Sequence, residues 1–196
     1  MNELNQINSL LKRVPNEGAP VVCLITGSSG CGKTHLAKAL AAALDQTRSE
    51  VCYFDSNGVP SLNEMVKEFG SPQKWQEITT HRWLAHIAQV KKPLAILEGS
   101  FNPHFAVEGC HFSGLTTYCI VVLTCAEKIW EERLRGPRAQ EDLITTDMRN
   151  WNRFLVEETV KLGGVVVDTS ASNVTENIIQ ITQLLMPLLE SKIRNT

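Results

Sequence analysis

Residues 27–34 read Gly-Ser-Ser-Gly-Cys-Gly-Lys-Thr and fit the pattern G-x-x-x-x-G-K-[ST] throughout. Glycines let a main chain curl closely around an anion, so that backbone N–H groups meet phosphate oxygens. Lys33 is expected to reach the β- and γ-phosphates of a nucleotide, and the Thr34 hydroxyl to ligate Mg²⁺. The sequence therefore predicts a nucleotide site made of Gly27, Ser28, Ser29, Gly30, Cys31, Gly32, Lys33, Thr34 and the adjacent His35.

Two carboxylates follow apolar segments that read as strands. Asp55 comes directly after residues 51–54, and Glu98 comes directly after residues 94–97. Because parallel strands deliver their carboxyl ends to one edge of a sheet, both carboxylates are expected to face the phosphate loop. Glu98 is the candidate for the metal shell, and Asp55 is the candidate base or substrate acceptor group. An exchange of these two roles stays open.

The elements that must position these residues alternate along the chain. Five short β-branched runs, at residues 21–26, 51–54, 94–97, 117–123 and 165–167, are nearly continuous in apolar character. This is typical of parallel strands that are covered on both faces. Helical patterns separate them, and a helix is expected to begin at Lys33, directly after the loop. The sequence thus predicts an α/β protein with a three-layer, doubly wound sheet of five parallel strands.

Several helix starts are readable. Ser61 and Glu64 have the spacing of a capping box, and Ser71 followed by Pro72 predicts an N-cap with proline at the first helical position. Apolar residues at helical spacing mark four further segments. These are Leu4, Ile7 and Leu11; Trp75, Ile78, Ile87 and Val90; Leu143, Ile144, Met148, Trp151 and Leu155; and Val174, Ile178, Ile181, Leu185 and Leu188.

Composition limits the classes of function. The 196 residues carry a formal net charge of −2, which argues against nucleic acid as the main partner. The longest purely apolar run, residues 119–123, is far too short to span a bilayer. The start of the chain lacks the pattern of an export signal, so the six cysteines are expected to be reduced thiols in a cytoplasmic protein. No membrane partner is expected, and a homodimer stays open.

Together these motifs resemble the P-loop small-molecule kinases, the group that contains adenylate, shikimate and gluconate kinases. The resemblance covers nearly the whole chain, residues 1–196, as one kinase-like domain. It rests on the loop 27–34, on Asp55, on residues 97–99, on an arginine-bearing segment after the fourth strand and on residues 167–170. It implies a strand order of 2-3-1-4-5, ATP and Mg²⁺ as cofactors, and phosphoryl transfer to a small-molecule acceptor.

The resemblance also implies two mobile or variable parts. A lid is expected at about residues 131–142, where Arg133, Arg135 and Arg138 are candidates for closing on the phosphoryl group. An acceptor-binding insertion is expected at about residues 56–92, with Asp55, Arg82 and Asn102 as candidate substrate contacts. Asp168 and Thr169 fall where such kinases pass the adenine. Surface pairing of the arginines with nearby carboxylates, and a plain turn at 168–170, remain the structural alternatives.

The acceptor itself cannot be carried over from any one kinase. Adenylate kinase has Asp-Gly where this chain has Glu98-Gly99, and shikimate kinase has a second aspartate where this chain has Asn57. A nucleotide, a nucleoside, a sugar or another hydroxylated metabolite all stay open. The alternative function is a nucleotide-binding regulatory or switch module without a phosphoacceptor. The sequence lacks the Asn-Lys-x-Asp guanine motif that GTPase switches need, and Glu98 is followed by glycine.

Overall fold

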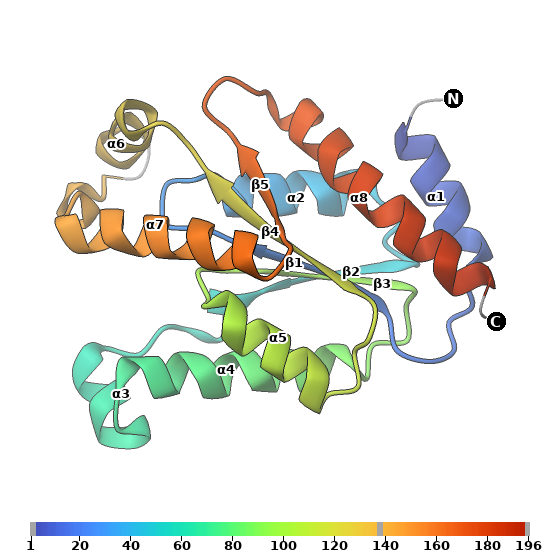
Figure 1. The fold of residues 1–196 in the computed structure, drawn as a ribbon, viewed down its shortest axis with the longest axis horizontal. Coiled ribbons are helices and arrows are strands. Elements are labelled where there is room, and N and C mark those ends of the chain that lie inside the picture. Colours follow the sequence, from blue (N-terminus) through green and yellow to red (C-terminus); the bar gives the residue numbers. More distant parts are fainter. Residues whose placement is uncertain (1–2, 137–138, 195–196) are drawn as a thin grey trace.

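The computed structural model describes residues 3–136 and 139–194. Within this part of the chain, five parallel strands form one sheet in the order β2-β3-β1-β4-β5 (Figure 1). The strands are β1 (Val21–Thr26), β2 (Ser49–Tyr53), β3 (Leu94–Glu98), β4 (Tyr118–Thr124) and β5 (Val165–Asp168). The parallel α/β architecture and the expected strand order are confirmed.

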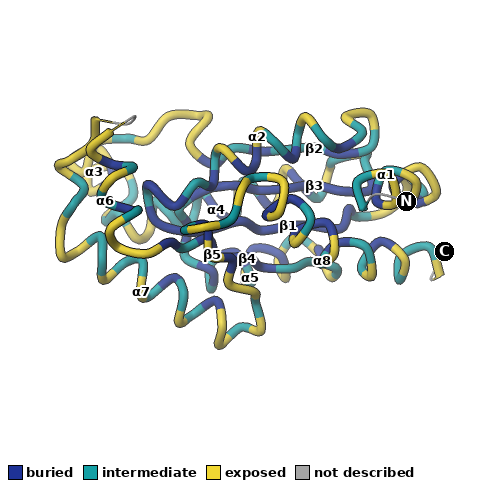
Figure 2. Tube along the Cα trace, turned by 90° about the horizontal axis from the view of Figure 1, so that it is seen from above, coloured by how far each residue is buried: buried dark blue, intermediate teal, exposed yellow. Residues whose placement is uncertain are grey.

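Helices cover both faces of the sheet (Figure 1). Alternate residues of β1 point to opposite faces, as the strand period of two requires. Val21, Cys23 and Ile25 join the core beneath α1 (Glu3–Arg13), α2 (Lys33–Ala43) and α8 (Val174–Arg194). Val22 and Leu24 join the core beneath α4 (Pro72–Ile87) and α5 (Pro103–Phe112). Figure 2 shows these buried residues running along the strands.

Two further helices, α3 (Leu62–Phe69) and α6 (Glu127–Arg135), lie toward the carboxyl ends of the strands (Figure 1). Helix α7 (Thr146–Lys161) packs against β4 and β5, and short 3₁₀ helices lie at Phe54–Asn57 and Glu141–Leu143. In α3 only Met65 is buried, so this helix is largely exposed (Figure 2). In the described ranges, 3–136 and 139–194, no helix has the length and apolar character needed to cross a bilayer.

The predicted helix starts are confirmed where a cap was readable. Ser61 and Glu64 form the capping box of α3. The Ser71 hydroxyl accepts a hydrogen bond from the backbone N–H of Lys74 at 3.0 Å, and Pro72 is the first residue of α4. Such caps satisfy backbone donors that have no partner inside the helix.

Several details differ from the prediction, among them Val90, which lies beyond the end of α4. Leu143 and Ile144 lie before α7, because the Thr145 hydroxyl accepts from the backbone N–H of Met148 at 3.1 Å and caps the helix there. Near the end of α8, Leu189 is fully buried, whereas Leu188 is half-buried. Helix α5 was not predicted, although its cap and its first-turn proline stand in the sequence as Asn102-Pro103.

Candidate nucleotide and phosphoryl-transfer site

The loop between β1 and α2 has a backbone that only glycine allows. Gly27, Gly30 and Gly32 have φ values of 147°, 87° and 90°. A Cβ on Gly27 would lie 2.5 Å from the Leu123 carbonyl oxygen of β4. The loop therefore curls tightly against the sheet, with the start of α2 directly behind it, as anion binding by backbone N–H groups requires.

This backbone makes a stability prediction. Replacing Gly27 by alanine should lower the free energy of unfolding by at least about 2 kcal/mol more than replacing Gly18 does, because the new Cβ meets a backbone oxygen. Gly18 is the matched control: its φ is 74°, and a Cβ there has nothing within 4 Å. Urea unfolding of both variants measures the difference. Equal losses would show that the close approach to Leu123 is not what requires glycine.

Side chains from three other elements hold the loop. The Trp130 indole of α6 donates from Nε1 to the Ser29 carbonyl oxygen at 2.7 Å. The Asn152 side chain of α7 accepts at Oδ1 from the Ser28 hydroxyl at 3.1 Å. The Thr169 hydroxyl, which follows β5, lies 3.2 Å from the Cys31 carbonyl oxygen and 3.1 Å from the Thr124 carbonyl oxygen, so its single proton links the turn to the loop or to β4. Trp130 and Asn152 were not predicted as site residues.

Lys33 and Thr34 begin α2 at the closed end of the loop. Lys33 is buried, and its Nζ donates to the Ser28 carbonyl oxygen at 3.0 Å. The Thr34 hydroxyl donates to Glu98 Oε1 at 3.1 Å. Glu98 is 5% exposed, and its strand position pairs with Ile25 of β1. The sheet register thus brings together the two residues that the sequence assigned to a metal shell.

The oxygens at this point fit a magnesium ion. A hydroxyl and a carboxylate are hard oxygen donors, and Mg²⁺ in such sites uses one or two protein ligands with phosphates and water. In the part of the chain that the structure describes, no group of three or more His, Cys, Asp or Glu side chains could hold a metal. Thr34 and Glu98 bring one hydroxyl and one carboxylate of this type together at the loop.

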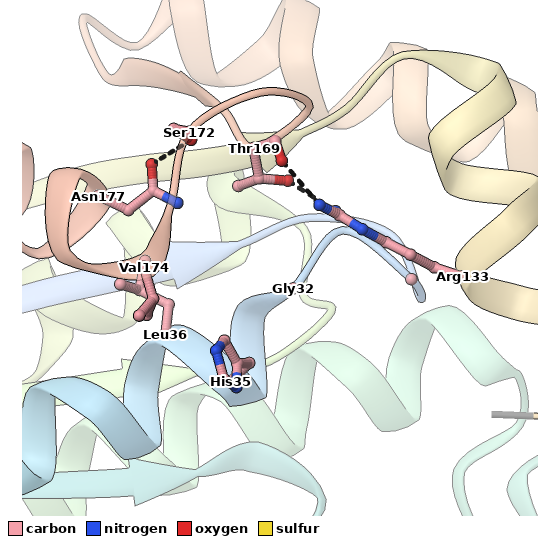
Figure 3. Close-up of a pocket in the computed structure, with 9 residues that line it drawn as sticks. Gly32, His35, Leu36, Arg133, Thr169, Ser172, Val174 and Asn177 are labelled. Carbon is pink, nitrogen blue, oxygen red and sulfur yellow. Dashed lines mark hydrogen bonds between the residues drawn. The ribbon is translucent and has the colours of Figure 1, made fainter. Parts of the chain in front are cut away.

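A cavity of about 470 Å³ adjoins the loop (Figure 3). Arg133 of α6 forms one wall, where its Nη1 and Nη2 donate to the Thr169 hydroxyl and carbonyl oxygens at 2.8 and 2.7 Å. Leu36 and Val174 lie across the cavity from it (Figure 3). The complete lining is Gly30, Gly32, His35, Leu36, Arg133, Thr169, Ser172, Val174 and Asn177. Helices α2, α6 and α8 and the turn after β5 thus build a compartment beside the phosphate loop.

Asp168 does not line this cavity. Its carboxylate accepts from the backbone N–H of Ser170 at 2.8 Å and also bonds the Ser170 hydroxyl. That arrangement is an Asx turn at the end of β5. Asp168 therefore shapes the turn that carries Thr169 and Ser172 to the cavity, whereas Thr169 reaches the loop itself.

The Cys31 thiol lies in the loop and is buried. Its pKa is lowered to about 6, chiefly because the Cys125 thiol donates a hydrogen bond to it; Ser28 and the charges of Lys33 and Arg133 lower it further, against the effect of burial. The same contact raises the pKa of Cys125. These contacts favour the thiolate form of Cys31.

This thiolate can be observed directly. As the pH rises through about 6, ultraviolet thiolate absorbance should increase in the wild-type protein, because the thiol loses its proton there. The Cys31→Ser variant should lack this step, since burial raises the pKa of Cys52 and Cys110 to about 11 and 12. A first step near the ordinary thiol pKa of about 8.5 would contradict the assignment.

The candidate acceptor residue Asp55 lies after the end of β2, and Arg82 lies in α4. Tyr53 pairs with Glu98 across the sheet, so Asp55, two residues later in the 3₁₀ helix, follows β2 at the same edge of the sheet where β3 ends. The Asp55 side chain is exposed there. Arg82 lines a second cavity of about 480 Å³, between the chain after β2, α3 and α4. Its lining is Asn57, Gly58, Pro60, Phe69, Trp75, Thr79, Arg82, Trp83 and His86.

The Asn102 side chain caps a helix. Its side chain accepts from the backbone N–H of His104 at 3.0 Å and caps α5. Its own backbone N–H donates to Gln76 Oε1 at 3.0 Å, while Gln76 Nε2 donates to the Ser100 carbonyl oxygen at 3.0 Å. Gln76 therefore clamps the loop that follows β3 against α4, a role that the sequence pattern did not reveal.

The three arginines predicted for the lid differ in where they lie. Arg133 binds Thr169 at the cavity beside the phosphate loop. Arg135 pairs with Glu131 at 2.9 Å and its side chain is 53% exposed, which is the surface pairing left open above. Arg138 lies outside the described residues. A further arginine, Arg149 of α7, was not predicted; it lies 5.5 Å from the Trp130 ring centre and pairs with Glu127 and Glu131.

A known protein family matches most of this chain. Residues 23–170 match the family model described as an AAA domain, which is about three quarters of the chain. No curated protein sequence matches the chain significantly.

Several solved structures share the fold. A gluconokinase from Sinorhizobium meliloti 1021 aligns at a TM-score of 0.60 and 17% identity, covering 91% of this chain and 97% of that chain. A shikimate kinase from Acinetobacter baumannii in complex with shikimate aligns at 0.57 and 14%, covering 86% and 94%. Thymidylate kinase from Candida albicans aligns at 0.55 and 11%, covering 90% and 95%. The chain belongs to the AAA domain family and has the fold of P-loop small-molecule kinases.

Proposed function

We propose that the protein is a phosphotransferase that uses ATP and Mg²⁺ to phosphorylate a small-molecule acceptor. The observation that carries the proposal is the contact of 3.1 Å between Thr34 Oγ1 and Glu98 Oε1 at the end of the phosphate loop. It brings a hydroxyl and a carboxylate, the usual protein ligands of nucleotide-bound magnesium, to the point where the terminal phosphates would lie.

Most of the catalysis that this site supports is placement and charge neutralisation. The backbone N–H groups of the loop would bind the phosphates, and Lys33 would turn from the Ser28 carbonyl to the β- and γ-oxygens. Thr34 and Glu98 would hold Mg²⁺, which would supply positive charge near the same oxygens. Arg133 would add further positive charge from the cavity beside the phosphate loop, which we assign to the nucleotide and call the nucleotide cavity. Arg135, after leaving its surface pair with Glu131, and Arg138 would add charge from the proposed lid at 131–142.

We assign the acceptor to the side of Asp55. The Asp55 carboxylate would accept the proton of the acceptor hydroxyl as that oxygen attacks the γ-phosphorus and the bond to ADP breaks. The second cavity, with Arg82 on its lining, supports an acceptor-binding role for residues 56–92.

All six cysteines are free thiols, which supports a cytoplasmic location.

A screen of metabolite pools for ATP consumption tests the proposal, with Lys33→Ala as the blank. At least one pool should accelerate ATP consumption by the wild-type protein well above its rate alone, and the blank should show no acceleration. ATP hydrolysis that is slow and unchanged by every pool would instead support the regulatory or switch module.

A further inference from the structure

The nucleotide cavity contains one buried amide that faces the space where a base would lie. Asn177 of α8 is 5% exposed and lines the cavity (Figure 3). One end of its amide meets the Ser172 hydroxyl, and the other end points into the cavity (Figure 3). Within residues 3–136 and 139–194, nothing hydrogen-bonds to that second end. That end is open to the cavity and not enclosed by protein, so its partner comes from water or a ligand.

The other polar groups of the lining already have partners. The guanidinium of Arg133 donates twice to Thr169, and the Thr169 hydroxyl in turn donates its single proton to the Cys31 or the Thr124 carbonyl oxygen. His35 is exposed at the mouth. The planar guanidinium and the apolar Leu36 and Val174 leave room for a flat ring between them (Figure 3). Among the described side chains, Asn177 is therefore the buried group available to the edge of that ring.

The proton of Ser172 decides which end of the amide faces the cavity. Ser172 Oγ lies 3.0 Å from the Asp168 carbonyl oxygen and 2.7 Å from Asn177 Oδ1. A hydroxyl has one proton, so it cannot donate fully to both oxygens. A carbonyl can only accept, whereas an amide exchanges its oxygen and nitrogen by a half-turn with almost no change of shape. After that half-turn, Asn177 donates to Ser172, Ser172 donates to Asp168, and both contacts are hydrogen bonds.

We infer that Asn177, oriented by Ser172, selects adenine over guanine by presenting its amide oxygen to the exocyclic amino group of the base. Adenine carries an amino donor at the position where guanine carries a carbonyl acceptor. The amide oxygen would bond the first and oppose the second. This inference rests on the proposed nucleotide site and adds to it the residue pair that determines the choice of base.

Calorimetric titration of the full chain with ADP and with GDP tests the inference. The wild-type protein should bind ADP at least about tenfold more tightly than GDP. Asn177→Leu should bring the ratio of the two affinities close to one. Asn177→Asp should keep the ratio, because a carboxylate presents oxygen in either orientation, while its charge weakens both nucleotides alike. Ser172→Ala should lower the ratio, because the amide can then turn either way.

Asn173→Asp is the matched control. It adds the same charge at the exposed residue directly before α8, outside the cavity lining, and should leave the ratio unchanged. Thermal melts establish that each variant is folded. If Asn177→Leu does not fold, Asn177→Asp tests the inference in its place. If the amide nitrogen faced the base in the wild-type protein, a carboxylate could not replace that donor, and the Asn177→Asp variant would lose the preference for ADP.

Wild-type protein that binds both nucleotides without favouring ADP would overturn this inference and leave the proposed function standing. So would an Asn177→Leu variant that keeps the wild-type ratio. Wild-type protein that binds neither nucleotide would overturn the proposed function and the inference together.

Discussion

Lys33→Ala is expected to lower the rate of ATP-dependent phosphoryl transfer by at least about a thousandfold while leaving the protein folded. Lys33 is the cation at the closed end of the loop, and its Nζ already lies within 3.0 Å of the loop carbonyl of Ser28. Alanine removes the charge that would follow the γ-phosphoryl group during transfer, whereas the backbone N–H groups of the loop remain.

The matched control for this variant is Lys38→Ala. Lys38 is an exposed lysine of the same helix, and its loss should leave the rate within about twofold, as surface substitutions do. The rate with the accelerating metabolite pool and the thermal midpoint are measured for both variants. Full activity of Lys33→Ala would refute the assignment of the loop, and a lowered midpoint in that variant alone would show that the lysine supports the fold instead.

Asp55→Asn should lower kcat by about 10²- to 10⁴-fold and change ATP affinity little. The amide keeps the size of the carboxylate but cannot accept the proton of an acceptor hydroxyl. Asp55 is exposed at the end of β2 and its side chain takes no part in the nucleotide cavity, so the nucleotide should bind as before. Turnover assays and ADP titrations separate these two effects.

Asp55→Asn and Glu98→Gln together determine which carboxylate has which role. Because Glu98 touches the Thr34 hydroxyl, Glu98→Gln should raise the Mg²⁺ concentration needed for half-maximal rate, and Asp55→Asn should not. The reverse result would exchange the roles of the two residues. Equal losses of kcat and of ATP affinity in Asp55→Asn would point to a structural role for Asp55.

The parts of the fold that the sequence predicted are those with strong local signals. Strand β1 matches the predicted residues 21–26, because an unbroken apolar run ends directly at a glycine-rich loop. The capping box placed α3, and the Ser71 cap with Pro72 placed α4. The contact between Thr34 and Glu98 was also foreseeable, because parallel strands end at one edge and Glu98 is the last residue of β3.

The residues that were missed act across long separations in sequence. Trp130 and Asn152 hold loop residues 101 and 124 positions away, and nothing in their own helices marks them as loop partners. Ser172 and Asn177 reach the nucleotide cavity only because β5 lies beside β4 and α8 returns across the sheet. The pairing of Arg135 with Glu131 depends on the helical turn of α6. From the sequence alone, this surface pair and a role in the lid were equally open.

A crystal structure with Mg²⁺ and a non-hydrolysable ATP analogue tests the central claim most directly. We expect the β- and γ-phosphates within hydrogen-bonding distance of the backbone N–H groups of residues 27–34, with the metal beside Thr34 and Glu98 and the base between Arg133 and Val174. An analogue bound elsewhere, or phosphates that leave the loop empty while the analogue occupies another cavity, would contradict the account.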